Sequence, residues 1–410
     1  MTLDLEFIRS QFPAFSEPSL DGWAFFENAG GSYPCNQVVK RLTDFYTKNK
    51  VQPYYPYPAS AYAGKLMDES YKRMAAYLNV APSEIHFGPS TTQNVYVLAN
   101  ALRPMWKESD EIIVSCQDHE ANGGAWRRLS ERGIKVIEWH VDYDTGILSV
   151  ESLKELISER TKMVAFPHCS NVIGHINSVE DISSLAHKYG AISVVDGVGY
   201  APHGFPDLKD LGADIYMFST YKTFGPHLGL MYISRELMPK MENQSHFFKE
   251  GITRSMFTPA GPDHAQIAAI NGILDYFDTV YAHHFSGEVK PALKNSQLRK
   301  LFREHETEIL EPLLKFLRSR DDVRIIGPEQ TEDRLPIVSI LPKKKTIKAV
   351  YDVLTEHKLM VGFGDFYAAR PLMDMDIPRN PGVLRMSFVH YTKPREIHQL
   401  IEGLKIALDQ

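Results

Sequence analysis

The feature that most constrains this chain is a set of three short apolar runs between residues 191 and 233, separated by turns rich in glycine, proline and aspartate. Such runs, bounded by turn residues, are typical of strands that are buried on both faces of a sheet. Asp196 follows the first run, and Lys222 lies just beyond the second. Open α/β sheets bind ligands beyond the ends of such strands, so these two side chains are candidates for a functional site.

An acid and a lysine in this arrangement match the requirements of pyridoxal phosphate (PLP). PLP needs a lysine amine for a Schiff base and an acid against its pyridine nitrogen, so that the ring can accept electrons from a substrate carbanion. The lysine must also lose its proton to act as a nucleophile, and it later moves the Cα proton. Ser219 and Thr220 add hydroxyls that suit a phosphate. An isolated strand-end acid and an unrelated surface lysine are the alternative, which the rest of the chain disfavours.

Apolar runs alternate with helical patterns through most of the chain, and this alternation predicts an α/β fold with a doubly wound, mostly parallel sheet. A smaller α+β domain is expected at the C-terminal end. We predict an N-terminal arm at residues 1–20 that joins the small domain, a large domain at 21–285 and the small domain at 286–410. Further strands are predicted at residues 84–88, 111–116, 135–139, 162–166, 323–326, 336–341 and 383–389. Helices are predicted at residues 3–11, 90–102, 149–159, 179–189, 264–277, 288–319, 347–357 and 394–408.

Composition excludes several classes of function. A net charge of −6 gives no electrostatic footprint for nucleic acid or an anionic membrane. The N-terminal residues lack the pattern of a secretory signal, and no apolar run approaches the ~18 residues that span a bilayer. The three cysteines are too widely spaced for a metal pattern or a disulfide framework. We therefore expect a cytoplasmic protein with no membrane partner, no nucleic-acid partner and no metal site.

Five polar residues outside the central stretch are further candidates. Thr91 and Thr92 open a predicted helix, where hydroxyls cap the helix and its free N–H groups can bind a phosphate. His119 follows a strand and can stack on a flat cofactor ring, or cap a helix. Asn171 suits a ring hydroxyl or a carboxylate. Arg385, inside an apolar strand, needs either a substrate carboxylate or a structural ion pair.

Two segments near the N-terminus are less specific. Asn28 begins a turn that contains a pair of glycines, which permits close approach of the backbone to a ligand, and we place Asn28 near the substrate. Residues 51–61 contain three tyrosines and three prolines and predict an ordered, non-helical loop. This loop would line a pocket, line a subunit interface or lie on the surface.

These elements together resemble the class V aminotransferases, in particular the cysteine desulfurase-like branch of the fold-type I PLP enzymes. The resemblance covers essentially the whole chain and rests on the segments FFENAGGS, STT, DHEAN, SNVIG, VVDGVGYAPH, FSTYKTFGPHLG and VLRMSFVHY. It implies that Lys222 carries PLP, that Asp196 pairs with the pyridine nitrogen and that His119 stacks on the ring. It also implies that Asn171 lies near the ring hydroxyl and the substrate.

The resemblance extends to the phosphate, the substrate and the assembly. Thr91 or Thr92, together with Ser219, would hold the phosphate. Arg385 would bind the substrate's α-carboxylate. The family also implies a homodimer with active sites at the interface, and Thr258 is our candidate for a phosphate contact from the partner subunit.

The departures from the family concern the substrate. Cysteine desulfurases carry a mobile cysteine in the loop before the arginine strand, and residues 362–380 contain no cysteine. Gly199 stands where the family commonly has glutamine or histidine, which predicts an unfilled space beside the cofactor. Tyr221 replaces a frequent histidine, and the segment at 51–61 replaces a histidine–arginine loop. The cofactor machinery is therefore kept while the substrate machinery is changed.

Four functions follow from these residues, and the sequence names no leaving group that would decide among them. An aminotransferase is our first expectation, and a β C–S lyase acting on cysteine or selenocysteine is close behind it. Amino-acid epimerisation is third. The alternative from another class is a PLP-binding scaffold with little activity, which would act as a sulfur-transfer partner or a regulator.

Overall fold

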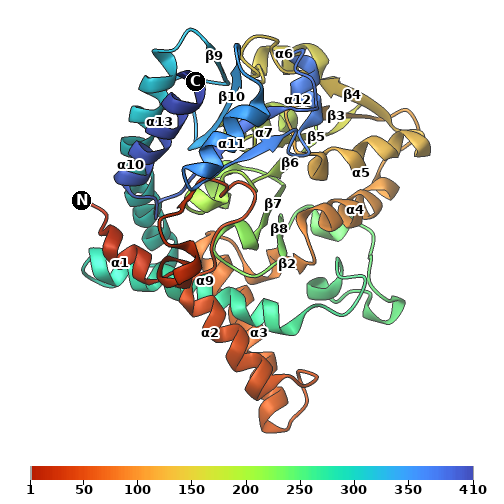
Figure 1. The fold of residues 1–410 in the computed structure, drawn as a ribbon. Coiled ribbons are helices and arrows are strands. Elements are labelled where there is room, and N and C mark those ends of the chain that lie inside the picture. The colour runs from red at the N-terminus through yellow and green to blue at the C-terminus, as the bar shows by residue number, and fades with distance from the viewer. Residues whose placement is uncertain (1, 410) are drawn as a thin grey trace.

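A seven-stranded sheet forms the centre of the larger part of the molecule in the computed structural model, which describes residues 2–409 (Figure 1). The order across the sheet is β2 (Ile85–Gly88), β8 (Gly229–Ile233), β7 (Ile215–Ser219), β6 (Ile192–Asp196), β5 (Thr161–Pro167), β3 (Glu111–Ser115) and β4 (Lys135–Trp139). Neighbours from β7 to β4 pair in parallel, and β8 is antiparallel to both of its neighbours. The predicted mostly parallel sheet is therefore confirmed.

Both faces of this sheet are buried, which explains why its strands read as continuous apolar runs. Val195 and Phe218 point into one apolar cluster, whereas their neighbours Val194 and Met217 point into the cluster on the opposite face. Because side chains alternate between the two faces of a strand, each strand supplies both clusters. The helices that cover this part are α1 (Leu5–Ser10), α2 (Asn36–Asp44), α3 (Pro58–Tyr77), α4 (Thr91–Leu102), α5 (Gly124–Arg127), α6 (Val150–Leu156), α7 (Val179–Lys188), α8 (Leu208–Leu211) and α9 (His264–His284).

The tyrosine- and proline-rich segment differs from its prediction. Residues 51–61 were expected to be non-helical, but α3 begins at Pro58, so the end of the segment is helical. A proline at the first position of a helix loses no hydrogen bond, and its fixed φ suits the helix. The prolines thus position the start of a long helix, which projects with α2 from the body of the molecule (Figure 1).

The C-terminal part is a smaller α+β unit. Its antiparallel sheet has the order β12 (Gly362–Gly364), β13 (Val383–Ser387), β10 (Ile337–Pro342) and β9 (Val323–Ile326). Its helices are α10 (Pro291–Arg318), α11 (Ile347–Glu356), α12 (Ala369–Asp374) and α13 (Pro394–Asp409). Within residues 2–409, no helix has the length and apolar character that would let it cross a membrane.

The N-terminal segment is joined to this smaller unit by backbone pairing. Strand β1 (Ala24–Phe25) pairs in parallel with β11 (Leu359–Met360). Ala24 and Phe26 are buried in the same apolar cluster as α10 and α13. The contact with the smaller unit therefore continues beyond the arm expected at residues 1–20, and it positions the turn that follows Phe26.

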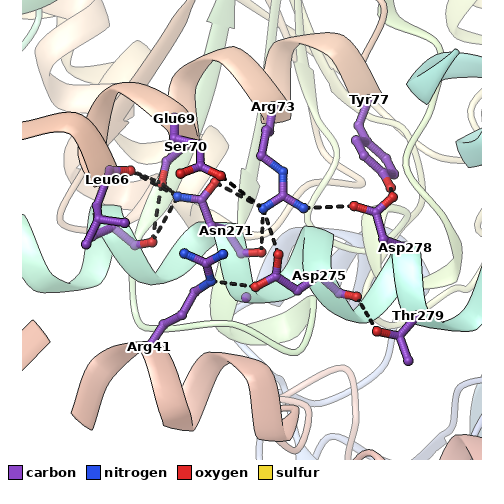
Figure 2. A network of polar contacts seen from close by, with 12 residues as sticks. Arg41, Leu66, Glu69, Ser70, Arg73, Tyr77, Asn271, Asp275, Asp278 and Thr279 are labelled. Atoms are coloured by element: carbon purple, nitrogen blue, oxygen red, sulfur yellow. Dashed lines mark hydrogen bonds and ion pairs between the residues drawn. The ribbon is translucent and has the colours of Figure 1, made fainter. Parts of the chain in front are cut away.

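Charged side chains join the three helices α2, α3 and α9 in one polar network (Figure 2). Arg73 of α3 donates to Asp275 at 2.7 Å and to Asp278 at 2.9 Å, both on α9. Tyr77 donates to the other carboxylate oxygen of Asp278 at 2.6 Å, and Arg41 of α2 donates to Asp275 at 2.5 Å. Each carboxylate thus receives more than one donor, which fixes the relative positions of these helices.

Replacing Arg73 with methionine is expected to lower the free energy of unfolding by about 1–2 kcal/mol, because both aspartates lose a charged donor in a partly exposed setting. The midpoint of denaturant unfolding measures this loss. Lys72→Met is the matched control, because Lys72 is an exposed neighbour on the same helix. Equal midpoints for the two variants would show that the network adds no stability.

Candidate active site

The ends of four central strands surround a cavity of about 180 Å³. The chain leaves β3 to form β4 on one side and then returns to form β5 on the other, and such a reversal opens a crevice where α/β proteins bind ligands. Seven of the predicted residues line this cavity: Thr91, Thr92, His119, Asn171, Asp196, Ser219 and Lys222. The structure therefore brings together residues from five separate parts of the sequence.

Lys222 and Asp196 are buried at the base of this arrangement, on the turn after β7 and at the last position of β6. Burial, followed by the charge of Arg385, lowers the pKa of Lys222 to about 8, against the opposing effects of Asp196 and Glu27. Burial raises the pKa of Asp196 to about 6, against the effects of Lys222 and of the Val198 N–H that donates to it at 2.8 Å. The site thus favours a neutral, nucleophilic amine close to neutral pH.

The start of α4 forms a polar corner of the cavity. Ser90 caps this helix and accepts from the backbone N–H of Gln93 at 3.2 Å. The hydroxyls of Thr91 and Ser219 lie 2.8 Å apart, whereas Thr92 is exposed. Hydroxyls that converge on the free N–H groups of a twelve-residue helix form a setting for a phosphate.

His119 lines the same cavity as a neutral imidazole. Burial, followed by the charges of Lys222 and Arg385, lowers its pKa to about 3. Its Nδ1 accepts from the backbone N–H of Ala121 at 3.0 Å, so the proton of the neutral ring is on Nε2. His119 thus caps the short helical turn that follows it, which was one of the two roles that the sequence allowed. Its stacking on a cofactor ring stays a prediction, which the neutral ring suits.

Arg385 does not line the cavity, because three neighbours surround its guanidinium. It forms an ion pair with Glu27, and it donates to the carbonyl of Asn171 at 3.0 Å. The ring of Phe366 lies over the guanidinium at 3.7 Å. The structural ion pair foreseen as one alternative for Arg385 is therefore present, and the substrate carboxylate stays a proposal.

Two predicted residues lie outside the cavity. Asn28 is buried, donates to the Ser387 carbonyl at 3.1 Å and accepts from the Tyr391 hydroxyl, so its amide holds the N-terminal segment on β13. Thr258 lines a separate, larger hollow of about 1150 Å³, which also contains Thr92 and the N-terminal end of α4. Their roles in substrate and phosphate binding stay predictions.

Gly199 does not leave the space that its sequence position suggested. A Cβ atom at Gly199 would lie 2.4 Å from the backbone oxygen of Cys169, which is far below a permitted contact. The prediction of an unfilled space is wrong, because the Cys169 carbonyl already occupies it. Tyr221 is likewise packed, with its ring stacked on that of His227 at 4.6 Å.

Glu27 and Phe366 contact Arg385 but were not predicted from the sequence as site residues. Glu27 ends an aromatic segment that precedes the turn at Asn28, and Phe366 lies in the loop that lacks the family's cysteine. The available signal for Glu27 was the need of Arg385 for a carboxylate partner. No local pattern could have identified Phe366. Its loop lies between β12 and β13, and its ring contacts Arg385 of β13 only once the smaller sheet has formed.

All three cysteines are buried and unpaired by disulfides. Burial raises the pKa of both Cys35 and Cys169 to about 12. The pKa of Cys116 is also raised, by burial and by the carboxylate of Glu138, which accepts from its thiol at 3.0 Å. The nucleophile of cysteine chemistry is the thiolate, so none of these thiols is activated.

Cys116 also belongs to a group of potential metal ligands. Its sulfur, a ring nitrogen of His140 and a carboxylate oxygen of Asp374 lie within 4.8 Å of one another. These atoms already have protein partners, because the thiol contacts Glu138 and His140 pairs with Asp374 at 2.9 Å. We therefore assign these contacts to the protein's own hydrogen bonding.

The residues around the cavity fit PLP. Lys222 offers an amine that is partly neutral, Asp196 offers a buried carboxyl group, and Thr91 and Ser219 offer hydroxyls at a helix start. In addition, the buried Oδ1 of Asn171 has no hydrogen-bond partner in residues 2–409, although its Nδ2 donates to the Phe366 carbonyl at 3.0 Å. Buried polar atoms are rarely left unpaired, so Oδ1 is suited to a donor on a ligand.

Known proteins are similar in sequence to nearly the whole of this chain. The model of the family described as aminotransferase class-V matches residues 24–278 and 287–400. The chain is 32% identical to the aminotransferase-like protein FGM3 of Gibberella zeae, over 99% of each protein. It is 30% identical to the cysteine desulfurase-like protein ustD of Aspergillus flavus, over 98% of this chain and 90% of that protein.

A solved structure has the same fold. The apo structure of a cysteine desulfurase from Thermococcus onnurineus NA1 matches with a TM-score of 0.85, over 100% of this chain and 99% of that chain. The two sequences are 22% identical, so this likeness concerns the fold alone. It confirms the predicted α/β fold class of PLP fold type I.

The pKa of Lys222 predicts how the protein without cofactor takes up PLP. Only the neutral amine attacks the cofactor's aldehyde, so the rate should rise with pH through about 8 and fall as the amine gains a proton below that value. Stopped-flow absorbance at a series of pH values measures this rate. A midpoint near that of an ordinary lysine, about 10.4, would contradict the lowered pKa.

Gly199→Ala tests the tight contact beside the cavity. The added methyl group must displace the Cys169 carbonyl, so we expect a loss of about 1–3 kcal/mol of stability and weaker retention of PLP. Thermal unfolding and dialysis measure these two effects. Gly261→Ala is the control, because nothing lies within 4 Å of a Cβ atom at Gly261 and the residue is exposed. If both variants behave like the unaltered protein, Gly199 is not constrained by this contact.

Proposed function

The chain belongs to the class V aminotransferase family of PLP-dependent enzymes, and from this premise we propose that it is an aminotransferase that acts on the Cα amine of an amino acid. PLP supplies an electron-accepting ring and an aldehyde that can take up the amine. The single observation that carries the proposal is the joint burial of Lys222 and Asp196 beside one cavity, with oppositely shifted pKa values.

The chain's own residues have distinct roles in this proposal. Lys222 would hold the cofactor, and its free amine would move the proton at Cα of the substrate. Asp196 would pair with the protonated pyridine nitrogen of the cofactor. His119 stays neutral and covers the ring without adding a charge, since its pKa is about 3. Asn171 offers its unpaired Oδ1 to the ring hydroxyl or the substrate.

A β C–S lyase is the second candidate, because the family also includes a relative described as cysteine desulfurase-like. The state of the thiols argues against a lyase that forms a persulfide on one of the chain's own cysteines. Cys169 is the cysteine that lines the cavity, and its thiol contacts the Gly174 carbonyl at 3.3 Å with a pKa of about 12. A lyase of this chain would have to release its sulfur product without a protein persulfide.

We further propose a cytoplasmic homodimer in which the partner contributes to the phosphate site. The large hollow that contains Thr258 borders Thr92, and the aromatic side chains of Phe247 and Phe248 are exposed in the preceding segment. Exposed aromatic side chains of this size favour a contact with another surface. Three reduced, buried cysteines are consistent with a reducing compartment.

A panel of amino acids, mixed with the purified enzyme and PLP, tests the choice of reaction. An aminotransferase should leave the substrate's amine on the cofactor, and an added keto acid should then recover it as a new amino acid. Absorbance and product analysis follow both halves. Lys222→Ala is the control, which should not hold PLP covalently after borohydride reduction. Release of sulfide or selenide with an unchanged cofactor would instead establish the lyase.

A further inference from the structure

Arg385 is already paired with a carboxylate of the chain itself. Both carboxylate oxygens of Glu27 contact the same guanidinium nitrogen, and the arginine side chain is only 2% exposed. Phe366 covers the flat face of the group, and the Asn171 carbonyl accepts from its other terminal nitrogen. A substrate carboxylate therefore finds its natural partner already paired.

The chain provides a fitted space for this carboxylate. A Cβ atom at Gly30 would lie 2.4 Å from one oxygen of Glu27, and a Cβ atom at Gly362 would lie 2.7 Å from the other. Gly362 is also the residue that pairs with Arg385 in the ladder between β12 and β13. The two glycines thus leave room that admits the Glu27 carboxylate and brings it to the guanidinium.

The position of Glu27 itself is set by backbone contacts. Glu27 forms a parallel bridge with Ser387, and the Ser387 N–H donates to the Phe26 carbonyl at 2.7 Å. The side chain of Ser387 accepts from the Ala29 N–H at 2.8 Å. The segment on both sides of Glu27 is therefore held on β13, while the Glu27 side chain is one quarter exposed.

The ion pair lies close enough to the cavity to act on it. The charges of both Arg385 and Glu27 influence Lys222, and the Asn171 that lines the cavity bonds to Arg385 through its carbonyl and to the Phe366 carbonyl through its amide. The buried Nε of Arg385 has no partner within the described chain. The guanidinium thus keeps an unused donor while Glu27 neutralises its charge.

We propose that Glu27 is a resident carboxylate that occupies Arg385 in the substrate-free enzyme and gives way to the carboxylate of the substrate. This inference rests on the proposed function, in which Arg385 receives that carboxylate. A buried guanidinium without a counter-charge is costly, so Glu27 keeps Arg385 paired until a ligand replaces it. Because Glu27 competes for Arg385, the exchange lowers the enzyme's affinity for carboxylate ligands. Glu27 is then a positioning residue, which acts on the substrate through Arg385.

Glu27→Gln tests the exchange directly, with propionate as the probe and its uncharged analogue propionamide as the ligand control. In the enzyme with PLP, the variant should unfold at a lower temperature because Arg385 loses its counter-charge. Propionate should restore this loss, at concentrations roughly tenfold below those that affect the unaltered enzyme. Propionamide should have no such effect. The measurement is the midpoint of thermal unfolding, so it requires no turnover.

Three further variants control the result. Glu402→Gln removes the same charge from an exposed position on α13 and should respond to propionate as the unaltered enzyme does. Glu27→Gln combined with Arg385→Met removes both charges and should lose the propionate response. Should Glu27→Gln not fold, Glu27→Asp retracts the carboxylate by one methylene and should show part of the gain.

A Glu27→Gln variant that responds to propionate no more than the unaltered enzyme would overturn the proposal. If Glu27→Gln does not fold, a Glu27→Asp variant with no increased response to propionate would overturn it as well. Glu27 would then only brace Arg385. A second readout is the KM for the amino acid, measured separately from kcat in the Glu27→Gln variant. The exchange predicts a lower KM than in the unaltered enzyme, whereas a purely structural role of Glu27 predicts a higher one. Failure of the proposed function is read separately, from an unaltered enzyme that transfers no amine.

Discussion

One buried guanidinium, that of Arg385, joins three parts of this molecule. It lies on β13 of the smaller unit and pairs with Glu27 of the N-terminal segment. It also donates to the carbonyl of Asn171, in the loop that follows β5 of the large sheet. A buried charge is tolerated only where partners surround it, so these contacts depend on one another. The loop with Phe366 completes the enclosure from the other side. The relative placement of the cavity and the smaller unit follows from these contacts.

The electrostatics of the cavity follow from burial more than from any single ion pair. Burial is the largest cause of the shifts at Lys222, Asp196 and His119, and it favours the neutral form of each. A neutral amine and a neutral imidazole suit a cofactor that carries its own charges on phosphate and ring. The site is therefore arranged to receive charge from a ligand, and the same is true of Arg385 once Glu27 turns away.

The loop before β13 is shaped by aromatic packing and contains no thiol. It carries Phe366, whose ring packs on Arg385. The backbone of Phe366 and of Tyr367 adopts positive φ angles of 49° and 56°, which few residues other than glycine adopt. Strained backbone of this kind persists where surrounding contacts require it, and here the contact of Phe366 with Arg385 is one of them.

Much of the candidate site could be predicted from the sequence, because its main signals are local. The apolar runs that end at Asp196 and before Lys222 had to be buried strands, and the hydroxyls at Thr91 had to start a helix. Parallel strands place their ends at one edge, so the meeting of His119, Asn171, Asp196 and Lys222 followed from the alternation of strands and helices. The need of Arg385 for a carboxylate was also evident from its apolar strand.

Contacts between distant residues could not be predicted in this way. The space beside Gly199 is filled by the Cys169 carbonyl, and the prolines near Tyr57 start a helix where a loop was expected. The sequence by itself therefore determined the sheet, the family and which candidate residues would meet at the cavity, because strand burial and helix starts leave local patterns. The tertiary structure alone decided that Glu27 and Phe366 enclose Arg385. Glu27 is 358 residues away from Arg385 in the sequence, and Phe366 reaches the guanidinium from the loop between β12 and β13, so no local sequence pattern encodes either contact.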